Sequence, residues 1–199
     1  FKSSDYLAML GDLAPELATD KPGALRLRRL PALRLVVRIG NAPAPGMIAF
    51  DDVPEHGSGQ DLARLRQRER DLQFDAAVNI QFTSGTTGHP KGATLTHHNI
   101  LNNGFFVGEA MRLTENDRVC IPVPLYHCFG MVLGNLACLT HGATIVYPSE
   151  GFDARAALET VEAEQCTALY GVPTMFIAEL DHPDRRMFDL SSLRTGIMA

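Results

Sequence analysis

The sequence predicts an α/β fold in which helices flank a mostly parallel β-sheet. From Ala76 onward, short apolar runs typical of buried strands alternate with longer segments of helical spacing. A loop rich in glycine and hydroxyl side chains directly follows the first of these runs, where open α/β sheets place ligands. Hydrophobic residues make up 45% of the chain and charged residues 21%, which is ordinary for a globular domain with a real core.

The first 70 residues carry weaker signals. Apolar spacing predicts a short helix from Ser4 to Leu17, followed by a break at Pro22-Gly23. Leu33 to Ile39 is the first strand candidate, and residues 40–60 contain many prolines and glycines and are expected to form a loop. A charged helix is expected over about residues 60–72.

The rest of the chain alternates regularly. Strands are expected at Ala77 to Phe82, Arg118 to Pro122, Ala143 to Tyr147, Ala168 to Tyr170 and near Leu193 to Met198. Helices are expected at His97 to Met111, around Met131 to Thr140, at Ala154 to Gln165 and at Thr174 to Leu180. Such alternation predicts a parallel sheet with helices on its faces.

The loop that follows the strand at Ala77 to Phe82 has the composition of a phosphate-binding loop. Glycines allow the backbone to approach a ligand, and they leave amide N–H groups free to point at anionic oxygens. The candidate phosphate ligands are the glycines Gly85 and Gly88, the hydroxyls of Thr83, Ser84, Thr86 and Thr87, and the ammonium of Lys91. Pro90 and Gly92 stand where a Walker loop would have Gly and Ser or Thr, so this is not a Walker loop. The alternative is a flexible turn without a ligand.

This run resembles the phosphate-loop signature of the adenylate-forming superfamily, which includes acyl-CoA synthetases, luciferases and the adenylation domains of peptide synthetases. Three later segments resemble family segments in order and spacing: Ala93 to Asn99, Pro124 to Gly130, and Leu169 to Phe176. The upstream part is similar to medium-chain fatty acyl-CoA synthetases. The resemblance implies a partial N-terminal domain of an acyl-CoA synthetase.

The resemblance also implies a division of the chain. Residues 1–74 are expected to form an upstream portion of the same domain, and residues 75–199 a βα core with the ATP phosphate loop and part of the acyl pocket. The family's adenine loop, magnesium-binding Glu, ribose-binding Asp and C-terminal domain with its adenylation Lys do not occur in this sequence. A fragment is therefore expected, and alone it is expected to be inactive.

The candidate site residues beyond the loop lie in Pro124 to Gly130. Taken alone, a His beside aromatic residues is more often structural than catalytic. The resemblance favours catalysis: His127 would position the carboxylate and act with Lys91, while Phe129 would form a wall of the acyl pocket and Gly130 a gap for the chain. His97 and His98 are expected to have structural roles at a helix start.

Each motif segment follows a predicted strand, so the phosphate loop, Pro124 to Gly130 and the Gly171 to Thr174 turn are expected at one edge of the sheet. The implied reaction has two halves: a fatty carboxylate attacks MgATP to give an acyl adenylate and pyrophosphate, and coenzyme A then displaces AMP. The loop donors, Lys91 and Mg²⁺ would neutralise developing charge. Gly85 and Gly88 would serve as hinges of a mobile loop.

Charge and cysteine usage limit other functions. The net charge of −5 gives no general attraction to nucleic acid, and the arginine runs are interpreted as solvated faces. Cys120, Cys128, Cys138 and Cys166 lack metal-ligand spacing and are expected to be buried free thiols in a reducing, cytoplasmic compartment, with no metal site. No apolar stretch is long enough for a membrane span. The oligomeric state is open.

Other readings remain open. Within the superfamily, the enzyme could activate an aryl acid or load a carrier protein instead of coenzyme A. Outside it, a phosphotransferase would yield ADP and phosphate from ATP, whereas adenylation yields AMP and pyrophosphate. A non-enzymatic nucleotide-binding module would bind ATP without turnover.

Overall fold

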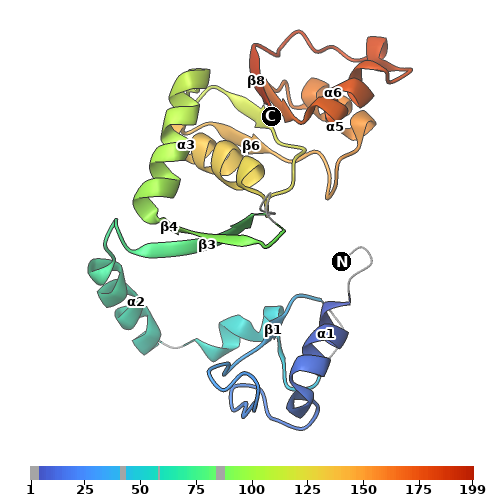
Figure 1. Ribbon diagram of the computed structural model, residues 1–199. Helices are drawn as coiled ribbons and strands as arrows, with labels where there is room; N and C mark the ends of the chain where they lie inside the picture. The colour runs from blue at the N-terminus through green and yellow to red at the C-terminus, as the bar shows by residue number, and fades with distance from the viewer. Residues whose placement is uncertain (1–4, 41–43, 58, 84–87) are drawn as a thin grey trace. The chain divides into compact units, whose positions relative to one another are not determined.

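The computed structural model describes residues 5–40, 44–57, 59–83 and 88–199. The chain divides into two compact units, Phe1–Asp71 and Leu72–Ala199. Figure 1 shows the helices and strands of each unit along the chain.

The first unit begins with a helix that is shorter than predicted. Helix α1 spans Tyr6–Leu13, and the Asp5 side chain caps it by accepting hydrogen bonds from the N–H groups of Leu7 and Ala8. A separate 3-10 helix, η1, spans Pro15–Ala18. The predicted single helix from Ser4 to Leu17 breaks because Pro15 disfavours helical backbone in the residue before it, and Ala14 adopts φ −140° and ψ 71°.

The expected strand at Leu33 to Ile39 is reduced to a two-residue strand. β1 (Val37–Arg38) pairs in parallel with β2 (Ile48–Ala49), which lies in the segment expected to be a loop. A 3-10 helix, η2 (Phe50–His56), and the charged helix α2 (Gly59–Asp71) follow. The core of this unit is a small cluster of Ala14, Leu17, Leu25 and Leu27.

The second unit contains the predicted parallel sheet. Within the described residues its strand order is β6-β5-β7-β8, and all three pairings are parallel. The strands are β5 (Arg118–Cys120), β6 (Thr144–Val146), β7 (Ala168–Gly171) and β8 (Thr195–Met198). Each lies at or inside its predicted range apart from one additional residue at the end of β7, so the prediction of a parallel βα core is confirmed.

Helices cover both faces of this sheet, as the period-2 alternation of strand side chains requires. Val119 and Ala168 face the cluster that includes Met111 and Cys138, whereas Cys120 and Leu169 face a second cluster. The first cluster involves α3 (His97–Met111), η3 (Phe129–Leu136) and α4 (Ala137–His141). The second cluster lies beneath α5 (Ala154–Ala163) and α6 (Pro173–Leu180), and a short 3-10 helix, η4, follows at Arg185–Met187.

A second strand, absent from the prediction, follows the phosphate loop and forms a β-hairpin with the strand before it. β3 (Ala77–Thr83) pairs in antiparallel register with β4 (Lys91–Thr96), and Thr83 stands opposite Lys91. The sequence analysis missed β4 and treated its residues as a lead into α3. In the described residues this hairpin forms its own two-stranded sheet. Prediction of this part was wrong because the alternating, β-branched run Ala93 to Thr96 is short and is followed at once by a strong helix signal.

Helix α3 has the predicted bounds, and a reciprocal cap explains where it begins. The Thr96 hydroxyl accepts from the Asn99 N–H at 3.1 Å, and the Asn99 side-chain oxygen accepts from the Thr96 N–H at 3.1 Å. The cap therefore comes from Thr96 and Asn99, not from the neighbouring histidines. His98 stacks at a tilt against Phe74, with ring centroids 5.7 Å apart.

The helix predicted around Met131 to Thr140 begins two residues earlier, at Phe129, and its first turns are π-helical. η3 is a π-helix that begins at Phe129, directly after the Pro124 to Cys128 segment, and it continues into α4. π-helical turns are rare and often occur at functional sites.

A buried carboxylate joins the amino ends of three neighbouring strands. Asp117, 4% exposed, precedes β5 and accepts hydrogen bonds from the Thr167 hydroxyl at 2.6 Å and from Arg194 Nε and Nη2 at 2.9 and 2.6 Å. Thr167 precedes β7, and Arg194 precedes β8. The Thr114 N–H also donates to Asp117, at 2.8 Å. Burial alone would raise the pKa of Asp117, but these hydrogen bonds and the Arg194 charge hold that pKa well below its usual value.

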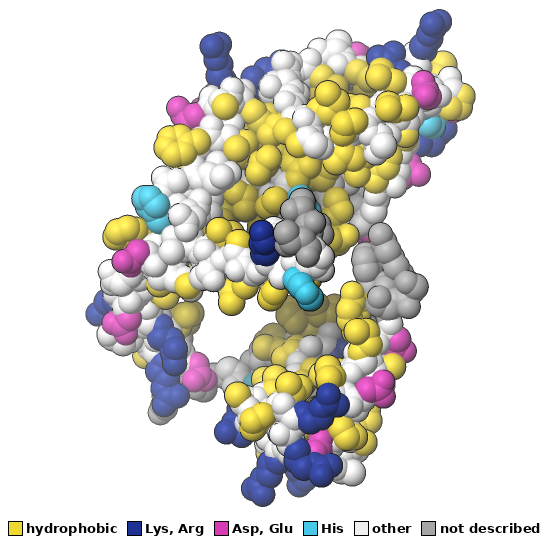
Figure 2. Space-filling view, in the orientation of Figure 1, with side chains coloured by type: hydrophobic (Ala, Val, Ile, Leu, Met, Phe, Trp, Pro, Cys, Tyr) yellow, Lys and Arg dark blue, Asp and Glu magenta, His cyan; other side chains and the backbone are white. Residues whose placement is uncertain are grey.

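Hydrophobic side chains also cover much of the visible surface of the second unit, and Figure 2 shows them in yellow. In the same view, Lys and Arg side chains lie on the visible face of the first unit. Within that unit, Arg28 pairs with Glu16 at 2.8 Å. Within the described ranges, no helix combines the length and apolar character needed to cross a membrane.

Replacing Asp117 by Asn should destabilise the second unit by about 3 kcal/mol at pH 7, because Arg194 loses its buried counter-ion. The lowered pKa means that this stabilisation is present above about pH 4 and is lost as the pH falls further. Urea unfolding of both chains between pH 3 and pH 7 measures this, with the exposed Asp75→Asn as the matched control. A constant difference at all pH values would contradict this assignment.

Glu179 on α6 predicts the opposite pH dependence. It is 4% exposed, its Oε1 has no hydrogen-bond partner among the described residues, and burial raises the pKa of Glu179 to about 7. The folded chain therefore resists ionisation of this group, so its stability falls as the pH rises from about 4.5 to 7. Glu179→Met should stabilise the chain by about 3 kcal/mol at pH 8, and by little at pH 4.5, in the same unfolding assay.

The exposed Glu150→Met is the control for this substitution. If Glu179→Met were no more stable than the original chain at pH 8, the buried carboxyl would not be a source of instability.

Candidate functional site

Two of the three segments expected at one sheet edge meet around a cavity. Pro124 to Gly130 follows β5, and the Gly171 to Thr174 segment runs from the last residue of β7, the parallel neighbour of β5, into the start of α6. Between them lies a cavity of about 380 Å³. Its lining includes Val123, His127, Phe129, Leu133, Val172 and Met175. The carboxyl ends of adjacent parallel strands thus bring these segments together, as predicted.

The third segment, the phosphate loop, is described only at its two ends. Thr83 is the last residue of β3 and Lys91 the first of β4, and both side chains are exposed. Of the predicted phosphate ligands, Ser84, Gly85, Thr86 and Thr87 lie outside the described residues. Gly88 adopts φ +89°, a backbone conformation that residues with a side chain rarely adopt. This conformation explains why the position holds glycine.

Hydrogen bonds from the backbone fix the orientation of the His127 ring. Nδ1 of His127 accepts from the N–H of Phe129 at 3.1 Å, and the Cys128 sulfur lies 3.7 Å from the same nitrogen. The His127 N–H donates to the Pro124 carbonyl at 3.2 Å, which closes a turn. Because Nδ1 accepts, a neutral His127 carries its proton on Nε2 and presents that atom as a hydrogen-bond donor.

Phe129 anchors this segment to the sheet. It is 6% exposed and stacks on Tyr170 of β7, with ring centroids 5.6 Å apart. The Tyr170 hydroxyl donates to the Leu133 carbonyl at 2.9 Å, and burial raises the pKa of Tyr170. Phe129 also lines the 380 Å³ cavity. The predicted role of Phe129 as a wall of an acyl pocket stays a prediction, and its position in the cavity wall is compatible with that role.

Gly130 is closely packed against backbone. A Cβ built on Gly130 would lie 2.5 Å from the Pro124 carbonyl oxygen, closer than real Cβ atoms approach an oxygen. The absence of a side chain therefore allows the first turn of η3 to pack on Pro124. The predicted role of Gly130 as a gap for the acyl chain stays a prediction.

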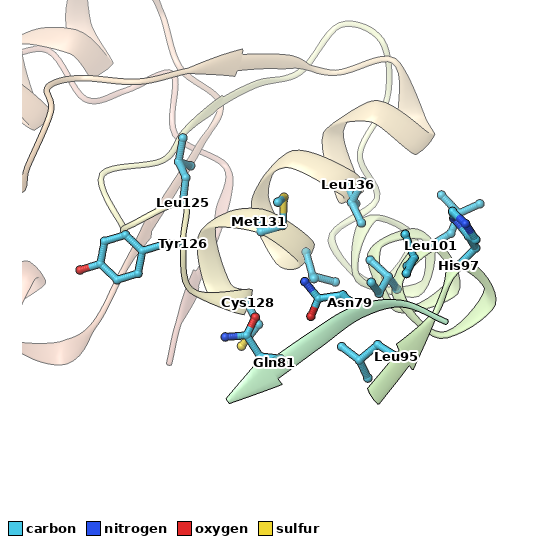
Figure 3. Close-up of a pocket in the computed structure, with 13 residues that line it drawn as sticks. Asn79, Gln81, Leu95, His97, Leu101, Leu125, Tyr126, Cys128, Met131 and Leu136 are labelled. Atoms are coloured by element: carbon cyan, nitrogen blue, oxygen red, sulfur yellow. The ribbon is translucent and has the colours of Figure 1, made fainter. Parts of the chain in front are cut away.

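A second and larger cavity, of about 610 Å³, was not predicted from the sequence. Figure 3 shows its walls: Asn79 and Gln81 on β3, Leu101 on α3, and Met131 and Leu136 on η3. Because β3 contributes to this cavity together with Tyr126 and Cys128, the hairpin that carries the phosphate loop lies beside the His127 segment. The sequence signal for this wall is the helical spacing of apolar residues on α3, from which only the helix was predicted.

The cysteine prediction was correct for three residues and wrong for one. Cys120, Cys138 and Cys166 are buried, whereas Cys128 is exposed and lines both cavities. Burial raises the pKa of Cys138 to about 11, as expected for an unreactive thiol. Cys128 was missed because it lies beyond the end of β5, where the chain leaves the core.

Comparisons with known proteins indicate one family for this chain. A family model described as AMP-binding enzyme matches residues 10–199. A putative acyl-CoA synthetase, YngI of Bacillus subtilis, is 49% identical over 199 residues, which are all of this chain and 36% of that protein. The mitochondrial medium-chain acyl-CoA ligase ACSF2 of Danio rerio is 48% identical over 203 residues, with all of this chain and 33% of that protein covered. The chain thus spans about a third of the length of these curated relatives.

Solved structures show the same fold. The anthranilate CoA ligase AuaEII in complex with anthranoyl-AMP superposes with a TM-score of 0.69 at 26% identity, covering 85% of this chain and 32% of that one. ATP-bound MatB from Rhodopseudomonas palustris gives a TM-score of 0.57 at 28% identity, covering 64% of this chain and 25% of that one.

Gly130→Ala should disturb the His127 segment through a steric clash. The added methyl group would meet the Pro124 carbonyl, so the first turn of η3 must shift, at a cost of about 1–3 kcal/mol. Thermal unfolding measures this, and Gly151→Ala, where a Cβ meets nothing within 4 Å, is the matched control. Equal effects of the two substitutions would contradict the packing role of Gly130.

Proposed function

Because the chain belongs to the AMP-binding enzyme family, we propose that it forms part of the N-terminal domain of an AMP-forming acyl-CoA synthetase. The proposed reaction has two steps. A carboxylate oxygen attacks the α-phosphorus of ATP, which forms an acyl adenylate and releases pyrophosphate. The sulfur of coenzyme A then attacks the acyl carbon, and AMP leaves.

One observation carries this proposal. The segment rich in glycine and hydroxyl groups connects two strands of a hairpin, and the hairpin forms one wall of a cavity that it shares with the His127 segment. A phosphate-binding loop beside an apolar cavity suits a substrate pair of a nucleotide and a carboxylic acid with an apolar body.

The proposed roles of the loop residues follow from their chemistry. The residues proposed to hold the ATP phosphates are Thr83, Ser84, Gly85, Thr86, Thr87, Gly88 and Lys91. Backbone N–H groups and hydroxyls donate hydrogen bonds to phosphate oxygens, and the Lys91 ammonium offsets negative charge that is redistributed as pyrophosphate leaves. Its position at the start of β4, opposite Thr83, fixes the base of the loop from which it acts.

His127 is proposed to orient the carboxylate. Because Nδ1 is engaged by the Phe129 N–H, the Nε2–H is the donor that this ring can offer to a substrate oxygen. The same donor can stabilise charge on that oxygen during attack on the α-phosphorus. Phe129 and Gly130 are proposed to shape the acyl side of the site.

Fatty acids of medium chain length are the proposed substrates. The apolar lining of the 380 Å³ cavity supports an aliphatic or aromatic body, and the Danio rerio relative is named a medium-chain acyl-CoA ligase. An aryl acid is the second candidate, favoured by the fold neighbour named as an anthranilate CoA ligase. Coenzyme A is the proposed acceptor, with a carrier-protein thiol as the alternative.

Magnesium is the usual partner of ATP in such reactions, but the described residues do not provide a site for it. No group of three or more His, Cys, Asp or Glu side chains in the described ranges is arranged to hold a metal ion. We propose a cytoplasmic location for the protein. One relative, ACSF2, is named as mitochondrial.

The test is acid-dependent exchange of pyrophosphate into ATP by the intact protein that carries this sequence. Lys91→Ala and His127→Ala should each lower the exchange rate by roughly 100- to 1000-fold, as expected when one preorganised donor to developing charge is lost. The exposed residues Lys21 and His56, each replaced by Ala, are matched controls that should retain exchange.

Two outcomes would contradict the proposal. ATP binding without exchange for any carboxylic acid would favour a non-enzymatic nucleotide-binding module. Release of ADP and phosphate would favour a phosphotransferase. The isolated 199-residue chain is proposed to bind ATP weakly and to form no acyl adenylate by itself.

A further inference from the structure

Tyr170 lies behind the wall of the 380 Å³ cavity and does not line the cavity itself. It belongs to β7 and is 0% exposed. Two residues that do line the cavity, Phe129 and Leu133, both contact Tyr170. Both belong to η3, so one buried side chain of the sheet supports two wall positions of that helix.

The two contacts of Tyr170 differ in kind. Its ring stacks on Phe129 with an angle of 21° between the ring planes, and its hydroxyl donates to the Leu133 carbonyl at 2.9 Å. The Met111 sulfur of α3 lies 3.0 Å from the same hydroxyl oxygen. Burial raises the pKa of Tyr170, so the hydroxyl keeps its proton and donates this bond at neutral pH. A stacked ring and a directional hydrogen bond together restrain both the distance of η3 from the sheet and its rotation.

A short path of contacts joins Tyr170 to His127. Phe129, on which the Tyr170 ring stacks, donates its backbone N–H to Nδ1 of His127 at 3.1 Å. This bond determines which nitrogen of the His127 ring carries the proton and where that nitrogen points. A shift of Phe129 would therefore change the direction of the Nε2–H of His127.

We propose that Tyr170 is a positioning residue for the reaction: through Phe129 it holds the His127 ring in the orientation in which Nε2–H reaches the substrate carboxylate. The inference rests on the proposed function, because the role of His127 belongs to that function. A displacement of about 1 Å in an orienting group can lower a rate by about 100-fold. Loss of the Tyr170 hydroxyl is therefore expected to slow the reaction without weakening the binding of ATP.

The experiment removes the hydroxyl and keeps the ring. Tyr170→Phe should lower kcat by about tenfold in the pyrophosphate exchange assay with the intact protein, and should change the KM for ATP by less than about twofold. The assay is run at a temperature at which thermal unfolding shows every variant to be folded. Tyr147→Phe is the matched control that should retain the exchange rate. Tyr147 also donates to η3, to Asn135 Oδ1 at 2.9 Å, but neither of these residues lines either cavity.

The same substitution in a His127→Ala chain separates positioning from general damage. If Tyr170 acts through His127, Tyr170→Phe should lower the remaining exchange by less than about twofold there, because the group that Tyr170 orients is gone. A loss of packing that affects the whole unit would instead lower exchange by the same factor in both chains.

A ¹⁵N spectrum of the intact protein labelled in its histidines reports on the ring without turnover. A neutral ring that is protonated only at Nε2 gives well separated shifts for its two nitrogens, and His127→Ala identifies the signals of His127. Tyr170→Phe should bring these two shifts closer together, because a ring that has lost its fixed partner exchanges between its two tautomers. Tyr147→Phe should leave them unchanged.

The outcomes separate this inference from the proposed function. If kcat falls with His127 present but not in the His127→Ala chain, and the two shifts converge, Tyr170 positions His127. If kcat is unchanged, if exchange falls equally in both chains, or if the shifts do not move, the inference is wrong while the proposed function stands. If the unsubstituted protein exchanges pyrophosphate with no carboxylic acid, the proposed function is wrong and the inference fails with it.

Discussion

The buried Asp117 carboxylate is the interaction on which the geometry of the sheet depends. It lies before β5 and accepts hydrogen bonds from Thr167, before β7, and from Arg194, before β8. These three strands are neighbours, and one carboxylate fixes the relative position of their amino ends. Since the strands are short and parallel, fixing one end also fixes the other. The carboxyl ends of β5 and β7, where the Pro124 to Gly130 and Gly171 to Thr174 segments begin, are thereby held side by side.

Stability and chemistry are thus separated along the strands. The amino ends carry the Asp117–Arg194 ion pair, in which full hydrogen bonding offsets the cost of burying the Asp117 carboxylate. The carboxyl ends carry exposed polar and apolar side chains around two cavities. His127 needs both an exposed ring and a fixed position. Its ring is exposed, and the turn that carries it is held by Phe129, which stacks on Tyr170 of β7. A rigid sheet therefore determines the direction in which the proposed Nε2–H donor points.

The sequence predicted the parts of this fold that have a strong local signal. The bounds of α3 and the placement of the parallel strands follow from hydrophobic periodicity and capping residues. It did not predict β4, because six residues with few large apolar side chains give a weak strand signal next to a helix start. The Asp117 cluster was also missed, since its members are 50 and 77 positions apart and only tertiary packing brings them together.

Prediction of the site shows the same division. His127 and Phe129 were found through motif resemblance, and the Gly171 to Thr174 segment through the strand-end rule. His127, Phe129 and Val172 of that segment line one cavity. The larger cavity depends on where the hairpin lies against α3 and η3, which no local pattern encodes. Cys128 and Gly130 also needed the structure, because the exposure of one and the tight packing of the other arise from the turn at Pro124.

The central claim is that the intact protein joins a carboxylate oxygen to the α-phosphorus of ATP. The most direct measurement uses a fatty acid labelled with ¹⁸O in both carboxylate oxygens and follows the label by mass spectrometry of the nucleotide product after addition of coenzyme A. The account predicts AMP that carries one ¹⁸O atom, because the bridging oxygen of the acyl adenylate stays with phosphorus when the thioester forms. Unlabelled nucleotide, or ADP as the product, would contradict it.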